Sequence, residues 1–145
     1  MTSEVFTAAD PTSRVIELEQ VTVNRGGKNI LEKIDWQVNA QDRWVIMGPN
    51  GAGKTTLMQI CTGFLHPTTG SARILGEKLG RTDVRELRTR IGLSSAALNN
   101  YLPLDETVFN TVLTAAYAVS GRWREKYDEV DFARTHELLS NWGLS

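Results

Sequence analysis

One stretch of this sequence combines three glycines with a lysine and two threonines at a spacing suited to holding phosphate. It runs GPNGAGKTT from Gly48 to Thr56 and fits the phosphate-binding loop pattern G-x-x-x-x-G-K-[ST]. Consecutive backbone N–H groups in such a turn can cradle phosphate oxygens, and a following helix adds unsatisfied donors and a partial positive charge. The pattern therefore predicts binding of a nucleotide through its phosphates.

Each side chain of this loop has a predicted role. Lys54 is placed to bring its ammonium to the β- and γ-phosphates. Thr55 can offer its hydroxyl to Mg²⁺, which takes few protein ligands when phosphates supply the rest, and Thr56 is a further donor. The alternative, a glycine-rich turn that only joins a strand to a helix, leaves the lysine and threonines unexplained. The candidate phosphate-binding residues are Gly48, Pro49, Asn50, Gly51, Ala52, Gly53, Lys54, Thr55 and Thr56.

A strand before the loop and a helix after it are needed to position these groups. Residues 44–47 form a short apolar run with a β-branched centre, which predicts a buried parallel strand. Residues 54–62 predict a helix with Leu57, Ile60 and Cys61 on one face. Strand, glycine-rich turn and helix is the context that the loop pattern requires.

The composition is that of an ordinary globular chain. The 145 residues are 41% hydrophobic and 23% charged, with a net charge of −1, so we expect one domain or part of one and no nucleic-acid partner. The single cysteine, Cys61, rules out an internal disulfide. No apolar run approaches the ~18 residues of a membrane span, and the N-terminus lacks a signal pattern. We therefore expect a cytoplasmic location.

Two segments upstream of the loop predict a second β layer. Residues 15–23 alternate between apolar and polar, and residues 30–38 carry apolar side chains at every second position of their second half. The glycine-rich residues 24–28 between them predict a turn. We expect an antiparallel piece beside the nucleotide-binding core. Residues 1–13 are polar and small, and they predict a mobile tail.

Shorter elements are predicted downstream of the loop. They are strands at 71–75 and 91–94 and helices at 83–90, 105–119 and 127–142. Asp83 and Asp105 are placed to cap the first two of these helices. The positions expected to face a core are Val108, Val112, Ala115 and Ala116 in one helix and Phe132, Leu138, Leu139 and Trp142 in the last.

Several of these motifs resemble those of ABC-transporter ATPase subunits. Residues 29–38 resemble the family's strand leading to the nucleotide site, and residues 48–57 resemble its version of the P-loop. Residues 63–76 continue the likeness at family-like spacing. The resemblance covers residues 15–96 closely, and from there to Ser145 only the helical character matches.

The resemblance implies an α/β fold: a P-loop core of mostly parallel strands, an N-terminal antiparallel β layer and the start of a helical subdomain. It implies binding of Mg-ATP, with Thr55 on the Mg²⁺, and ATP hydrolysis that drives transport across a membrane in the full-length domain. The implied partners are a second ATPase domain, identical or related, and membrane-spanning transport subunits. Such a chain would lie at the inner face of the cell membrane.

Two positions depart from the family's pattern. Arg25 stands before Gly26 and Gly27, where the family usually places an aromatic residue against adenine. A guanidinium can also lie over an adenine face, and a solvated arginine in a turn is the alternative. Ala96 stands at the position of the family's Q-loop glutamine, and a methyl group can perform neither of that residue's polar roles. Whether a membrane partner exists is therefore left open.

The family's signature motif and its acidic strand end are not found before Ser145. Residues 102–106, LPLDE, superficially resemble that acidic strand, but Pro103 argues against a central strand. Asp105 as a helix N-cap and Glu106 in the first turn explain both acids. We expect residues 14–145 to be an ABC-type nucleotide-binding domain truncated before those motifs. Such a chain has no complete catalytic set and would bind ATP without meaningful turnover.

Two other readings of the sequence remain open. One is a soluble ABC-type ATPase or regulatory module without a membrane partner, which Ala96 favours. The other is a P-loop kinase for a small molecule, for which the sequence offers no recognisable acceptor site. His66 and His136 have no partner at metal-ligand or triad spacing, and we expect both to be solvated or hydrogen-bonded.

Overall fold

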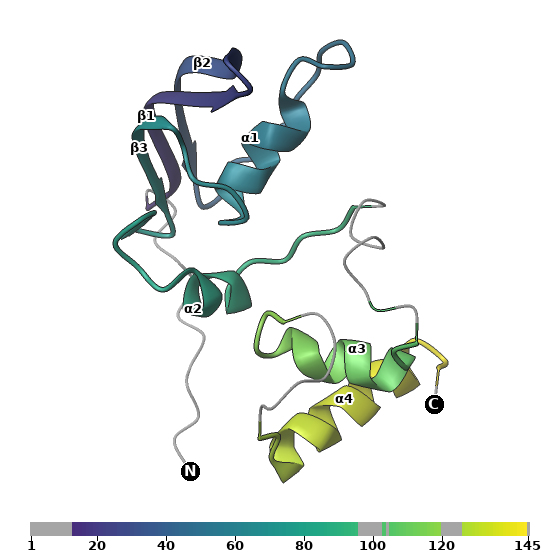
Figure 1. Cartoon of the computed structure of the whole chain (residues 1–145). Helices are drawn as coiled ribbons and strands as arrows, with labels where there is room; N and C mark the ends of the chain where they lie inside the picture. The colour runs from purple at the N-terminus through teal and green to yellow at the C-terminus, as the bar shows by residue number, and fades with distance from the viewer. Residues whose placement is uncertain (1–12, 96–102, 104, 120–125, 145) are drawn as a thin grey trace. The chain divides into compact units, whose positions relative to one another are not determined.

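The computed structural model describes residues 13–95, 103, 105–119 and 126–144 (Figure 1). The chain divides into two compact units, Met1–Val84 and Arg85–Ser145. The first unit contains the sheet and the predicted phosphate-binding loop, and the second contains the C-terminal helices. Residues 1–12 of the predicted tail and Ala96 lie outside the described residues.

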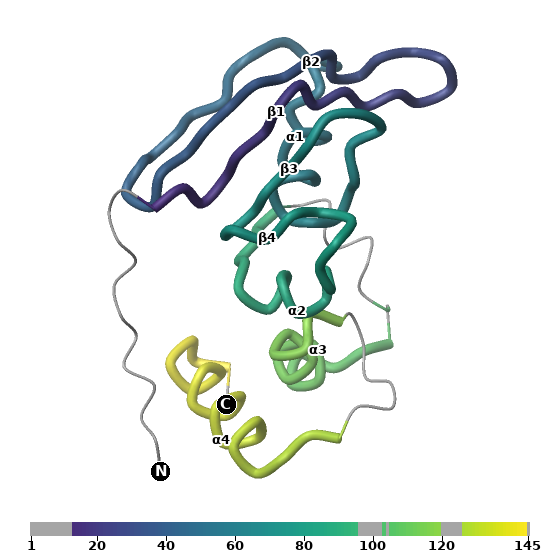
Figure 2. Tube along the Cα trace, turned by 90° about the vertical axis from the view of Figure 1, so that its left-hand side faces the viewer, coloured from purple at the N-terminus to yellow at the C-terminus, as the bar shows by residue number. Residues whose placement is uncertain are grey.

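The first unit is built on a four-stranded sheet with the order β2-β1-β3-β4. The strands are β1 (Arg14–Arg25), β2 (Lys28–Asn39), β3 (Thr69–Ile74) and β4 (Glu77–Lys78). Every pairing among them is antiparallel, and β1 and β2 form a long hairpin (Figure 2). The predicted antiparallel piece is thus confirmed, and β3 extends it on the other side of β1.

A two-residue turn joins β1 to β2. Gly26 and Gly27 have φ angles of 59° and 79°, as a type I′ hairpin turn requires at both central positions. Asn24 fixes the turn, because its Oδ1 accepts from Gly27 N at 3.1 Å and its Nδ2 donates to Asn29 Oδ1 at 2.9 Å. The end of the hairpin is therefore a tight and well-bonded structure.

Helix α1 (Lys54–Cys61) packs on this sheet and confirms the predicted helix. Ile60 and Cys61 are buried and Leu57 is half-buried, so the predicted apolar face turns toward the core. Removing this apolar surface from water is the main force that holds helix and sheet together. The strand residues of the core are Leu18, Val21, Val23, Leu31, Val38, Ala72 and Ile74.

Two predicted strands do not form in this structure: residues 44–47, predicted as a parallel strand, and residues 91–94. Every strand pairing in the described part of the chain is antiparallel. Trp44, Val45 and Met47 are 57%, 82% and 87% exposed. A strand needs a neighbour to accept its backbone hydrogen bonds, and the described sheet offers none to these segments.

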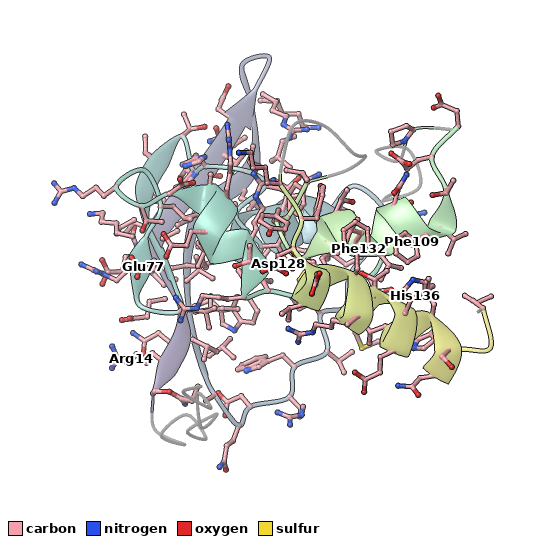
Figure 3. All side chains as sticks on the ribbon, turned by 90° about the horizontal axis from the view of Figure 1, so that it is seen from below. Arg14, Glu77, Phe109, Asp128, Phe132 and His136 are labelled. Carbon is pink, nitrogen blue, oxygen red and sulfur yellow. The ribbon has the colours of Figure 1, made fainter. Side chains whose placement is uncertain are left out.

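The second unit contains α3 (Val108–Ala115) and α4 (Glu129–Asn141), and α2 (Val84–Thr89) begins at the last residue of the first unit and continues into the second. The α3–α4 contact centres on Phe109, whose ring lies 6.1 Å from that of Phe132 and 4.8 Å from that of His136, between centroids (Figure 3). Leu113, one turn after Phe109, and Leu139 are buried. The two helices thus form a small apolar contact with an aromatic centre.

The predicted start and inner face of α3 are wrong. Thr107, not Asp105, is the N-cap: its Oγ1 accepts from Asn110 N at 3.1 Å. Glu106 lies before the helix, where its carboxylate accepts from Thr107 N and Asn110 Nδ2. Val108 is exposed, whereas its neighbour Phe109 takes the face toward α4. The predicted inner residues Ala115 and Ala116 are exposed as well, and Val112 is half-buried.

The predicted C-terminal helix is confirmed, with a later start. Asp128 and Asp131 form a capping box in which each carboxylate accepts from the other residue's backbone N–H. Leu139 is buried, but Leu138 and Trp142 are 45% and 79% exposed. Asp83 immediately precedes α2, at the position predicted for its cap.

Candidate phosphate-binding site

The N-terminus of α1 is open to an anion. Its first intrahelical hydrogen bond runs from Leu57 N to Gly53 O at 2.9 Å, so the N–H groups of Lys54, Thr55 and Thr56 have no carbonyl one turn earlier. The N-cap residue is Gly53, and no side chain caps the helix. Unsatisfied donors and the positive end of a helix dipole are features that favour the binding of phosphate.

Gly53 seats the loop against β2. Its φ of 84° lies in the left-handed region, and a Cβ there would lie 2.7 Å from Leu31 Cδ2 and 2.8 Å from the Ile30 carbonyl oxygen. Both distances are shorter than real carbon contacts, so this position requires glycine. The third glycine of the pattern thus sets how closely the start of the helix approaches the sheet.

The Lys54 side chain folds back across the loop that precedes it. Its Nζ donates to Gly48 O at 2.7 Å and to Pro49 O at 2.8 Å, and the Ala52 N–H donates to the same Pro49 oxygen at 3.2 Å. An ammonium has three donors, so one remains for a phosphate oxygen. The loop carbonyls therefore hold the positive charge at the loop before any ligand arrives.

The two threonines of the motif lie in different surroundings. Thr55 is exposed, whereas Thr56 is only 8% exposed. A ligand can therefore reach the hydroxyl of Thr55, which the sequence assigns to Mg²⁺, and Thr56 can contribute through its backbone N–H. Within the described ranges, no group of three or more His, Cys, Asp or Glu side chains could hold a metal. Mg²⁺ bound through phosphates does not need such a group.

Arg25 lies at the end of β1, beside the hairpin turn, and is exposed. Val23, two residues earlier, pairs with Leu31, against which Gly53 packs. The pairing of β1 with β2 shifts register between Val23 and Asn24, so the strand period does not fix the face on which the Arg25 side chain lies.

Sequence reasoning missed the residues that anchor the site. Ile30 and Leu31 support Gly53, and Thr68 fixes the hairpin through a hydrogen bond from Asn24 N to Thr68 Oγ1 at 3.0 Å. The adjacent apolar residues Ile30 and Leu31 near the start of β2 were a visible sequence signal for the contact with Gly53. Cys61 takes no part, since burial raises the pKa of its thiol to about 11 and keeps it protonated and unreactive.

Comparisons with known proteins agree with this geometry. The family model described as ABC transporter matches residues 31–144. An uncharacterized ABC transporter ATP-binding protein of Bacillus subtilis, YlmA, is 41% identical over 108 residues, which are 74% of this chain and 41% of that protein. A putative ABC transporter ATP-binding protein of Streptococcus mutans is 32% identical over 126 residues, 87% of this chain and 48% of that protein.

Solved structures show the same fold. A dimeric bacterial ABC transporter cassette, MJ0796, aligns with a TM-score of 0.66 and 25% identity over 86% of this chain and 56% of that one. A nucleotide-free cassette aligns with a TM-score of 0.62 and 20% identity over 91% and 55%. The chain therefore spans about half the length of the proteins it matches. No helix in the described residues has the length and apolarity needed to cross a membrane.

Proposed function

Because the chain belongs to the ABC transporter family, as an ATP-binding subunit, we propose that it binds Mg-ATP at residues 48–56. The observation that carries this proposal is the uncapped start of α1, with the Lys54 ammonium held across the loop before it. Donors and a positive charge that are already in place lose little freedom when phosphate binds, which favours affinity.

Each residue of the loop has a role in this proposal. Lys54 binds the β- and γ-phosphates with its remaining donor, and Thr55 holds Mg²⁺ through its exposed hydroxyl. The backbone N–H groups from Asn50 to Thr56 surround the phosphate oxygens. The Arg25 guanidinium lies over the base. These contacts supply the binding half of phosphoryl transfer, which depends mostly on positioning and charge stabilisation.

We further propose that ATP hydrolysis by the full-length domain drives transport across a membrane. Two ATPase domains, identical or related, would act together at the cytoplasmic face with membrane-spanning subunits. The relatives' description as ABC transporter ATP-binding proteins supports this role, and the dimeric MJ0796 cassette supports the pairing. The domain would begin at residue 14, and the 145-residue chain alone would show no meaningful turnover.

A calorimetric titration with Mg-ATP tests the binding proposal. Lys54→Ala should weaken binding about 100-fold, because it removes a charge-assisted contact to phosphate. Arg73→Ala is the matched control, since Arg73 is an exposed cation on β3 away from the loop, and it should leave affinity unchanged. Equal affinities for the parent chain and Lys54→Ala would refute the proposed site. Turnover that is as fast as that of an intact family member and that Lys54→Ala abolishes would refute the binding-only role of this chain.

A further inference from the structure

Asn50 and Gly51 are the central residues of an exposed turn within the phosphate-binding loop. One backbone hydrogen bond closes this turn, from Ala52 N to Pro49 O at 3.2 Å. Both central residues are exposed, and a Cβ built on Gly51 would have no atom within 4 Å. The peptide link between Asn50 and Gly51 therefore has room to rotate, and the single bond that opposes the rotation lies at the long end of the usual range.

The carboxamide of Asn50 is not held by a neighbour. Within the ranges that the structure describes, this side chain makes no hydrogen bond. Other asparagines are held, since Asn39 Nδ2 donates to Asp42 Oδ2 at 3.3 Å and Asn110 Nδ2 donates to Glu106 Oε1 at 2.8 Å. The Asn50 side chain can therefore turn its Cγ toward the backbone nitrogen that follows it.

An asparagine followed by glycine is suited to intramolecular deamidation. The Gly51 backbone nitrogen attacks the Asn50 Cγ, a new N–C bond closes a succinimide ring, and the carboxamide nitrogen leaves as ammonia with the proton of the attacking nitrogen. Glycine favours this step because no Cβ hinders the approach. Water then opens the ring at either carbonyl. The products are aspartate, with the original backbone, and isoaspartate, in which the backbone runs through the side-chain carbon.

We propose that Asn50–Gly51 is a deamidation site that inactivates the empty phosphate-binding loop and that bound Mg-ATP protects. Isoaspartate lengthens the backbone directly after Pro49, whose carbonyl accepts from Lys54 Nζ at 2.8 Å, so the N–H groups of the loop no longer converge on phosphate. The new carboxylate also repels the phosphates. A bound nucleotide orders the loop and prevents the rotation that ring closure needs. This inference rests on the nucleotide binding proposed above, and it adds a modification that depends on whether the loop is occupied.

The test is incubation of the full chain at mildly alkaline pH, followed by peptide mapping with mass spectrometry that separates aspartate from isoaspartate. Asn50 should react at least about tenfold faster than Asn39, the matched control, because the residue after Asn39 has a Cβ and Asp42 holds the Asn39 carboxamide. Gly51→Ala places a Cβ in open space and should slow the reaction of Asn50 by a similar factor of about ten.

The same incubation with nucleotide tests the protection. Mg-ATP at about ten times its dissociation constant should slow the reaction of Asn50 about tenfold, because only the empty loop reacts. Lys54→Ala should lose this protection at the same nucleotide concentration. Asn50→Asp separates the new charge from the longer backbone and should weaken Mg-ATP binding about tenfold. The purified isoaspartyl chain should bind at least about 100-fold more weakly than the parent, because several backbone donors to phosphate are lost.

Each part of the proposal has its own contradicting outcome. Reaction of Asn50 that is no faster than that of Asn39 would overturn the deamidation site, and an isoaspartyl chain that binds Mg-ATP as tightly as the parent would overturn the inactivation. A parent chain that binds Mg-ATP in calorimetry but reacts equally fast with and without it would overturn the protection and leave the phosphate site intact. A chain that neither binds Mg-ATP nor is protected by it would overturn the phosphate site, and this inference with it.

Discussion

Residues 48–56 and residues 44–47 adjoin in the chain, but they are held in different ways. The loop has hydrogen bonds within itself, from Lys54 to two of its carbonyls, and Gly53 is seated on β2. The apolar segment before it is not a strand, and three of its four side chains are exposed. Hydrogen bonds between neighbouring residues and one packed contact hold the loop at residues 48–56. Residues 44–47 could form a strand only beside a partner strand.

The largest loss of stability should come from disrupting the contact between Gly53 and β2. Gly53→Ala places a methyl group against Leu31 and the Ile30 carbonyl at a φ of 84°, and it should lower the free energy of unfolding by about 2–4 kcal/mol. Gly51→Ala is the matched control, because Gly51 has a φ of 83° with nothing within 4 Å. It should cost about 1 kcal/mol, from the backbone conformation alone. Urea unfolding measures both values, and equal losses would contradict the seating of Gly53.

A pair of valines tests the comparison directly. Val21 is 0% exposed and Val45 is 82% exposed. Val21→Ala should lower the free energy of unfolding by about 2 kcal/mol, because it removes buried apolar volume. Val45→Ala should change it by less than about 0.5 kcal/mol. The same urea experiment measures both, and a comparable loss in the two variants would show that residues 44–47 pack as a strand after all.

The N-cap of α3 in the C-terminal unit is a second feature that depends on residues close in the sequence. Thr107→Ala removes the hydroxyl that caps α3 and should cost about 1 kcal/mol of helix stability. Asp105→Ala, two residues earlier, is the control and should cost less than about 0.5 kcal/mol. Thermal unfolding followed by circular dichroism measures both variants. A larger loss of stability in Asp105→Ala than in Thr107→Ala would show that Asp105 is the N-cap.

The smallest effect concerns the contact of Tyr117 with α4. Its hydroxyl donates to Asp131 Oδ2 at 2.8 Å, and this bond to a carboxylate raises the pKa of Tyr117 above its ordinary 10.0. The bond stabilises the folded state below that ordinary pKa, and the contribution is lost as the pH rises through the folded value. An absorbance titration of tyrosinate should show a lower pKa for Tyr117 in Asp131→Asn. An unchanged pKa would contradict the hydrogen bond as its cause.

The elements that the sequence predicted well are those specified by nearby residues. The helix after Lys54 follows from its glycine-rich start and apolar face, and the hairpin follows from alternation around Gly26 and Gly27. Residues 44–47 were mispredicted because an apolar run describes a buried strand only when partner strands surround it. The prediction of a strand at residues 44–47 therefore also assumed partner strands formed by residues distant in the sequence.

The errors in the helical unit have a different origin. Asp105 and Thr107 are both good N-cap residues, and the contacts of Asn110 and Phe109 decide between them. The capping box of Asp128 and Asp131 had a visible signal, an acidic residue three positions after an Asp. For the site itself, the sequence predicts the phosphate-binding residues, and the structure shows Lys54 and Gly53 ordering the loop that contains them. The contact of Gly53 with Ile30 and Leu31 is a tertiary one, so the apolar pair marks the partner residues without showing that Gly53 packs on them.

Amide hydrogen exchange, with and without Mg-ATP, tests the central claim most directly. We expect fast exchange at residues 44–47 in both conditions, because these residues are not part of a hydrogen-bonded strand. We expect protection at residues 57–61 of α1 throughout, and new protection at residues 50–56 when Mg-ATP is added. Slow exchange at 44–47, or no change at 50–56 with saturating nucleotide, would contradict a phosphate site that forms without its neighbouring strand.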